Sequence, residues 1–114
     1  MAMLDRLINN ADRNAHNLLV CLNDQTKQIA IDHGCSFCMK KKTDDSVAWE
    51  YFRNNPELAT LDDELTGCLR SLLEHQDEVK ARMPEDIRRR LEAGIEPRVF
   101  ETAQKMLGAG TILV

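Results

Sequence analysis

Two cysteines separated by two residues, Cys35 and Cys38 in the segment HGCSFC, are the residues with the clearest chemical potential. This spacing can supply half of a tetrahedral zinc site, or a redox pair when a nearby charge stabilises one thiolate. His33 is a candidate third zinc ligand, and the lysines at 40–42 favour a thiolate electrostatically. A second Cys-x-x-Cys pair, which would make a strong zinc motif, does not occur in the sequence. Inert thiols, redox chemistry and zinc binding therefore all stay open.

The segment GCSFC resembles the thiol pair of the carboxymuconolactone-decarboxylase family, whose members are all-helical. In that family the thiol pair performs peroxide-linked chemistry, and the resemblance alone does not extend this activity to Cys35 and Cys38. In the peroxidase-type members of that family, a histidine follows the second cysteine by four residues and a glutamate precedes the pair. Here Lys42 stands at the first of these positions, and no glutamate precedes the pair. The resemblance therefore covers the thiols and not the groups that handle protons.

Other catalytic motifs are missing from the 114 residues. The sequence has no Gly-rich phosphate loop, no Gly-x-Ser-x-Gly elbow and no His-Glu-x-x-His pair. Its carboxylates fall at expected helix caps or on expected helix surfaces. We therefore expect a protein that is not an enzyme and that needs no cofactor.

Composition limits the class of protein further. A net charge of −4 gives no general attraction to nucleic acid, and an apolar fraction of 43% is enough for one globular core. We expect a single helical domain over residues 1–114. No apolar run reaches the roughly 18 residues of a membrane span, and MAMLDR is unlike a secretory signal. The expected location is the cytoplasm, where the four cysteines would be free thiols.

A regular apolar pattern over residues 3–32 predicts one long α-helix, because apolar residues recur there at alternating spacings of four and three. Such a helix would measure about 45 Å, which exceeds the ~35 Å diameter expected for a compact chain of this size. It could break near Asn23-Asp24, pack within its own chain, or project onto a second copy. We predict a homodimer, with a self-association seam that consists of Leu4, Ile8, Ala11, Ala15, Leu18 and Leu22.

Proline, glycine and capping residues predict the remaining helices. A second long helix is expected over 61–82, capped by Thr60, and short helices are expected over 47–54, 85–93 and 98–107. The apolar tail at 109–114 needs a docking site. The predicted fold class is all-α: a small helical bundle with two long and three short helices.

An aromatic cluster in the segment 47–54 predicts a binding surface for another protein. Trp49, Tyr51 and Phe52 are the expected contact residues, because aromatic side chains dominate interface hot spots. We therefore predict a small adaptor, chaperone or anti-activator that sequesters a larger protein, such as a transcriptional regulator or a secretion component. The alternative is a thiol-redox or zinc-stapled helical protein that uses Cys35 and Cys38. DNA binding by helices within 84–107 is disfavoured by the acidic charge balance, and no membrane partner is expected.

Overall fold

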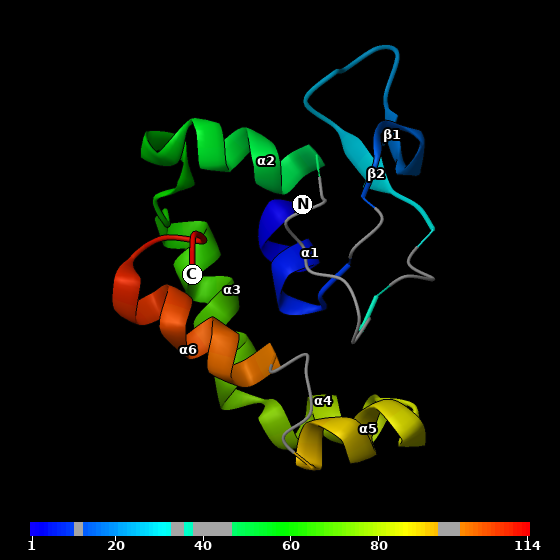
Figure 1. The fold of residues 1–114 in the computed structure, drawn as a ribbon, viewed down its shortest axis with the longest axis vertical. Helices are drawn as coiled ribbons and strands as arrows, with labels where there is room; N and C mark the ends of the chain where they lie inside the picture. Colours follow the sequence, from blue (N-terminus) through cyan, green and yellow to red (C-terminus); the bar gives the residue numbers. More distant parts are fainter. Residues whose placement is uncertain (11–12, 33–35, 38–46, 94–98) are drawn as a thin grey trace.

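The computed structural model describes residues 1–10, 13–32, 36–37, 47–93 and 99–114. Within these ranges, helices surround a core and a β-hairpin extends from one end (Figure 1). The hairpin pairs β1, Leu18–Val20, with the antiparallel strand β2, Gln28–Ala30. The predicted all-α class is therefore wrong, because the chain is a mixed α and β structure.

Residues 3–32 do not form the predicted long helix. The helix α1 covers only Ala2–Leu7, and Asn9 follows it with a φ of 48°, in the left-handed region that ends a helix. A 3₁₀ turn, Ala15–Asn17, begins where the side chain of Asn14 accepts a hydrogen bond from the His16 N–H at 2.9 Å. Short polar side chains of this kind compete with the helical hydrogen bonds, so the apolar spacing does not produce a helix here.

The hairpin occupies the second half of that stretch. Its register pairs Leu18 with Ala30 and Leu19 with Ile29. The loop is closed by Asp24, whose side chain accepts hydrogen bonds from the backbone N–H and the hydroxyl of Thr26. Asn23-Asp24, the expected break in a helix, is therefore part of a side-chain-stabilised turn.

The prediction of a second long helix over 61–82 is also wrong, because two helices separated at His75 occupy this segment. The helix α3 covers Asp63–Glu74, and α4 covers Gln76–Arg82. His75 lies between them with φ −107° and ψ 27°, and its ring Nδ1 lies 2.8 Å from the Ser71 carbonyl oxygen. Asp62, rather than Thr60, caps α3, because its carboxylate accepts a hydrogen bond from the Leu65 N–H at 2.7 Å.

The three short helices lie close to where the sequence predicts them. The helix α2 spans Val47–Asn54, α5 spans Glu85–Glu92, and α6 spans Val99–Ala109. A 3₁₀ turn, Pro56–Ala59, lies between α2 and α3 in the chain. Proline and glycine constrain the backbone locally, so the ends of these helices can be predicted from the sequence without knowledge of the tertiary structure.

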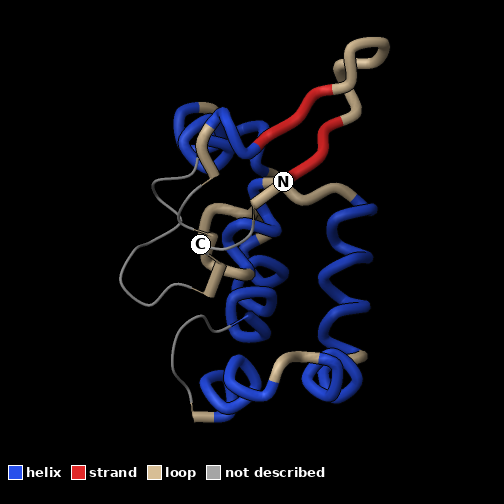
Figure 2. The backbone as a smooth tube through the Cα atoms, turned by 90° about the vertical axis from the view of Figure 1, so that its right-hand side faces the viewer, coloured by secondary structure: helices blue, strands red, loops and turns tan. Residues whose placement is uncertain are grey.

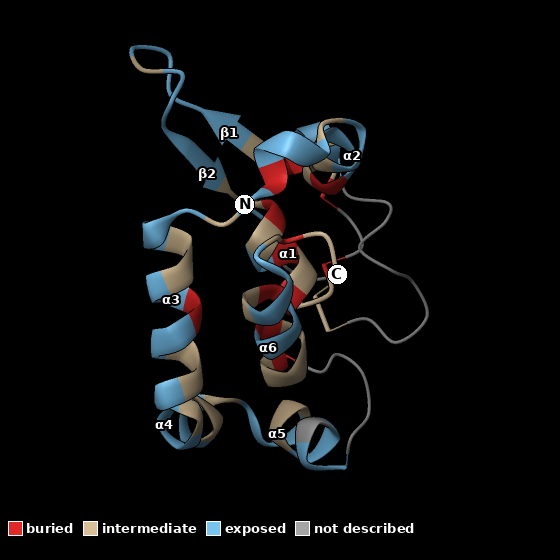
Figure 3. Ribbon diagram, turned by 90° about the vertical axis from the view of Figure 1, so that its left-hand side faces the viewer, coloured by how far each residue is buried: buried red, intermediate tan, exposed pale blue. Residues whose placement is uncertain are grey.

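The core lies where α1, α2, α3 and α6 face one another (Figure 3). Its buried apolar side chains come from all four helices, from the 3₁₀ turn at 56–59 and from the C-terminal tail: Ala2, Leu7, Trp49, Ala59, Leu69, Val99, Ala103, Met106 and Ile112. The tail docks through hydrogen bonds from the Ile112 N–H to the Ala59 carbonyl and from the Leu61 N–H to the Gly110 carbonyl. Gly110 has a φ of 69°, which a glycine adopts without steric cost and which turns the chain after α6.

The molecule measures 40 × 28 × 25 Å, with the hairpin near one end of the long axis and α4 and α5 at the other (Figure 2). None of the helices in the described ranges combines the length and the apolar character needed to cross a bilayer. The extent of the predicted single domain, 1–114, stays a prediction.

Candidate functional site

A buried arginine lies at the base of the hairpin. The Arg13 side chain is fully buried, and so is its partner Asp5 on α1. The Arg13 Nε lies 3.1 and 3.2 Å from the two carboxylate oxygens of Asp5, and one Nη lies 3.0 Å from the first of them. The other Nη donates to the backbone carbonyls of Asn17, at 2.9 Å, and Ile31, at 2.8 Å. One guanidinium therefore connects α1 to the residue before β1 and to the residue after β2.

Asn17 and Asp32 are brought together by the strand pairing. Asn17 directly precedes β1, and Asp32 follows β2 by two residues. The Ile31 N–H donates to the Asn17 carbonyl at 3.1 Å, which extends the ladder to this end. Because the strands are antiparallel, the start of β1 and the end of β2 lie at the same end of the hairpin. Asn17 therefore lies opposite Ile31, and Asp32 is the next residue along the chain at the same end of the hairpin.

Asp32 has a strained backbone. Its φ is 54°, in a region that residues with a side chain seldom occupy. Such conformations persist where the surrounding structure holds them, and they concentrate at functional sites. The residue is exposed to solvent, whereas Asn17 is buried.

The chemistry of this pair suits a hard cation. Amide and carboxylate oxygens are ligands of Mg²⁺, which is commonly bound by one or two carboxylates together with substrate phosphates. No group of three His, Cys, Asp or Glu side chains within the described ranges could hold a metal by itself. A metal at Asn17 and Asp32 would thus need ligands from a bound phosphate compound or from water.

The positions of Asn17 and Asp32 in the sequence also match spacings that are known from kinases. Protein kinases have an aspartate and an asparagine separated by four residues, and an Asp-Phe-Gly segment further along the chain. This chain has Asp12 and Asn17 at the first spacing and Asp32-His33-Gly34 at the second. Asp12, His33 and Gly34 lie outside the described residues, so their part in the pattern rests on the sequence alone. Both spacings were readable from the sequence, and the prediction of a non-catalytic chain missed them.

Both spacings also occur in phosphoryl-transfer enzymes, and a comparison with protein families gives a result of the same kind. A model of the phosphatidylinositol 3- and 4-kinase family matches residues 1–97. The chain belongs to this family. Neither a curated protein nor a solved structure matches it.

Family membership overturns the prediction of a non-enzymatic adaptor, chaperone or anti-activator, and it overturns the prediction that the chain is not an enzyme. Both rested on the lack of a Gly-rich loop and other familiar motifs. Two short spacings, Asp-x₄-Asn and Asp-x-Gly, are compatible with the family, and each is too brief to stand out by composition.

The predicted self-association seam does not share one helix face. Leu4 lies in α1, Ala15 in the 3₁₀ turn, Leu18 in β1 and Leu22 in the hairpin loop, while Ile8 directly follows α1. Ala11 lies outside the described residues. Leu22 is 98% exposed. Without a common helix, the seam has lost its geometric basis, and self-association stays an untested prediction.

The predicted aromatic contact residues separate into core and surface. Trp49 is buried, with the guanidinium carbon of Arg6 5.5 Å from its ring centroid. Tyr51 is 55% exposed and meets the half-buried Phe52 edge to face, at a centroid distance of 5.4 Å. Trp49 therefore packs the core, and binding of a partner protein at Tyr51 and Phe52 stays untested.

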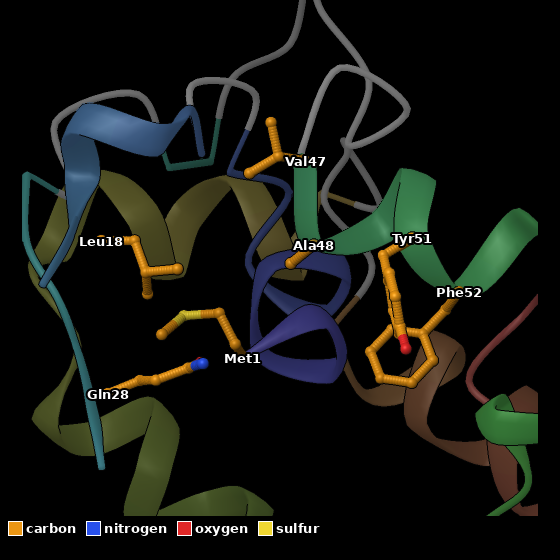
Figure 4. A pocket seen from close by; sticks show the side chains of 7 residues that line it. All are labelled: Met1, Leu18, Gln28, Val47, Ala48, Tyr51 and Phe52. Atoms are coloured by element: carbon orange, nitrogen blue, oxygen red, sulfur yellow. The ribbon is translucent and has the colours of Figure 1, made fainter. Parts of the chain in front are cut away.

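A pocket of about 360 Å³ lies between the hairpin and α2 (Figure 4). Its walls come from the hairpin, from α2 and from the first residue of the chain: Met1, Leu18, Gln28, Val47, Ala48, Tyr51 and Phe52. Tyr51 and Phe52 thus line a largely apolar hollow beside the hairpin rather than a flat surface.

The predicted zinc or thiol site, His33, Cys35 and Cys38, lies outside the described residues. Cys21 and Cys68 are free and exposed thiols, on the hairpin loop and on α3 respectively.

Proposed function

We propose that this chain carries part of the phosphoryl-transfer centre of a lipid kinase, which phosphorylates an inositol hydroxyl of phosphatidylinositol. The observation that carries the proposal is the juxtaposition of Asn17 and Asp32 at one end of the hairpin, held by Arg13 through the carbonyls of Asn17 and Ile31. Membership of the phosphatidylinositol 3- and 4-kinase family supports the choice of substrate.

The proposed reaction uses a nucleoside triphosphate as the phosphoryl donor. The inositol hydroxyl oxygen bonds to the γ-phosphorus, and the bond from that phosphorus to the β–γ bridging oxygen breaks. The nucleoside diphosphate leaves with the bonding electron pair. The hydroxyl proton passes to a carboxylate, for which Asp12 is the candidate because it precedes Asn17 by five residues.

Asn17 and Asp32 are the residues that would hold a divalent cation in this centre. When bound, Mg²⁺ supplies charge neutralisation for the phosphates of the donor. The contribution of the chain is to keep an amide and a carboxylate oxygen at fixed positions, so that little reorganisation is needed during the reaction.

The direct test is transfer of ³²P from labelled ATP to phosphatidylinositol vesicles by the purified full-length protein with Mg²⁺. The unaltered protein should label the lipid, and Asp32→Asn should lower kcat/KM by about 100-fold or more, because an electrostatic contact to the reacting phosphates is lost. The matched control is Asp24→Asn, an aspartate in the same hairpin, where asparagine can still cap the turn. Absence of lipid labelling by the unaltered protein, or equal activity of Asp32→Asn, would overturn the proposal.

A cytoplasmic location is part of the same proposal. The exposed free thiols of Cys21 and Cys68 support it, because reducing compartments keep such thiols from forming disulfides.

A further inference from the structure

We propose that Asp5 and Arg13 are a positioning pair for divalent-metal binding, acting through Asn17 and Asp32. This inference rests on the proposed function and adds to it a role for α1. Neither Asp5 nor Arg13 is assigned to the metal itself: each acts by fixing the backbone that carries the two candidate ligands.

Arg13 joins Asp5 to the residues that flank β1 and β2 at one end of the hairpin. Two hydrogen bonds from Nε and one ion pair from Nη hold the guanidinium against the Asp5 carboxylate, at 3.0–3.2 Å. The remaining Nη contacts the carbonyl of Asn17 itself and the carbonyl of Ile31, the residue immediately before Asp32. Movement of the guanidinium would therefore break the hydrogen bonds that hold the backbone at Asn17 and directly before Asp32.

The hairpin needs such a support. Its strands have three residues each, and an isolated two-stranded hairpin is at best marginally stable in water. Asp32 also holds a left-handed φ of 54°, which must be maintained by its surroundings. The helix α1 can supply that support, because Ala2 and Leu7 anchor it in the core on either side of Asp5.

Stability alone does not explain the pair. Removing two charges from water has a high desolvation cost, and apolar residues of similar volume often replace a buried ion pair without loss of stability. The site also requires arginine in particular, because a planar guanidinium can donate hydrogen bonds to a carboxylate and to two carbonyls in fixed directions. A lysine carries the same charge on a single nitrogen and cannot reproduce these contacts.

The experiment measures Mn²⁺ affinity by electron paramagnetic resonance titration of the full chain and of its Arg13→Lys variant. We expect Arg13→Lys to bind Mn²⁺ about 10-fold more weakly, as is typical when a residue that orients a metal ligand is changed. Arg6→Lys is the matched control. Arg6 lies on the same helix, donates to the Val114 carbonyl at 2.9 Å and contacts Trp49, but these contacts do not involve the hairpin. Arg6→Lys should leave Mn²⁺ affinity unchanged.

Two further variants separate the possible failures. Asp32→Asn tests the proposed function: if it leaves Mn²⁺ affinity unchanged, both the metal site and the positioning pair are wrong. If Asp32→Asn weakens binding while folded Arg13→Lys does not, only the positioning pair is wrong. Should Arg13→Lys fail to fold, Asp5→Asn takes its place, because asparagine keeps the shape and one acceptor oxygen. Asp5→Asn should then weaken Mn²⁺ binding several-fold, and unchanged affinity would overturn the inference.

Discussion

At the scale of single residues, Asp5 and Arg13 are under the strongest electrostatic constraint, because both charges are fully buried. Asp5→Ala would leave the guanidinium in the interior without its carboxylate. We expect a loss of about 3–5 kcal/mol in the free energy of unfolding, measured by urea denaturation. Glu50→Ala on α2, an exposed carboxylate, is the control and should change stability by less than about 0.5 kcal/mol. Equal unfolding midpoints for the two variants would show that the buried pair has no such role.

Asp12 and Asn17 are assigned different tasks, and kinetics can separate them. Asp12→Asn should lower kcat by about 10²–10⁴-fold, the range typical for loss of a general base. Its Mn²⁺ affinity should stay close to that of the unaltered protein, because Asp12 is not a proposed metal ligand. Asn17→Ala should lower kcat and should also weaken Mn²⁺ binding, because Asn17 is a proposed metal ligand. A common loss of Mn²⁺ affinity in both variants would argue against this division of roles.

Asp12, Asn17 and Asp32 all lie within residues 3–32, where the apolar pattern predicts one long helix. In such a helix, polar residues between the apolar positions need no functional explanation. The pair Cys35 and Cys38 has the clearer chemical signal, because its spacing matches half of a zinc site or a redox pair.

At the scale of elements, the helices α2, α5 and α6 were predictable and the hairpin was not. Proline and glycine punctuate the helices and act through local backbone geometry. The strands β1 and β2 have three residues each, which is too short for an alternating pattern to be recognised. Their pairing depends on the turn at Asp24 and on Arg13, and the contacts of Arg13 with Asp5 and Ile31 span many residues of sequence.

The packing of α6 against α3 is the element contact on which the core depends most. Met106 on α6 is fully buried, close to Leu69 of α3 in the same apolar cluster. Met106→Ala should lower the free energy of unfolding by about 2–5 kcal/mol, because it leaves a cavity. Gln104→Ala, at an exposed position of the same helix, is the control and should have little effect. Similar thermal unfolding curves for the two variants would contradict the described orientation of α6.

At the scale of the whole molecule, the hairpin and the helices α4 and α5 lie toward opposite ends of the long axis (Figure 1). The basic run at 88–90 on α5 is therefore remote from Asn17 and Asp32. Arg89 forms an ion pair with Glu85 that is largely exposed on both sides. Arg89→Ala should change neither Mn²⁺ affinity nor kcat, and should alter stability by no more than about 1 kcal/mol in thermal unfolding. A large fall in Mn²⁺ affinity would show that this end of the molecule takes part in the site.

The central claim is that Asn17 and Asp32 together hold a divalent cation. Anomalous diffraction from crystals of the protein soaked with Mn²⁺ and ADP tests it most directly, because manganese can be located independently of the protein atoms. We predict an anomalous peak within coordination distance, roughly 2.0–2.6 Å, of oxygen atoms from both side chains. A peak bound elsewhere on the protein, or no manganese at these two residues in crystals that contain ADP, would contradict the account.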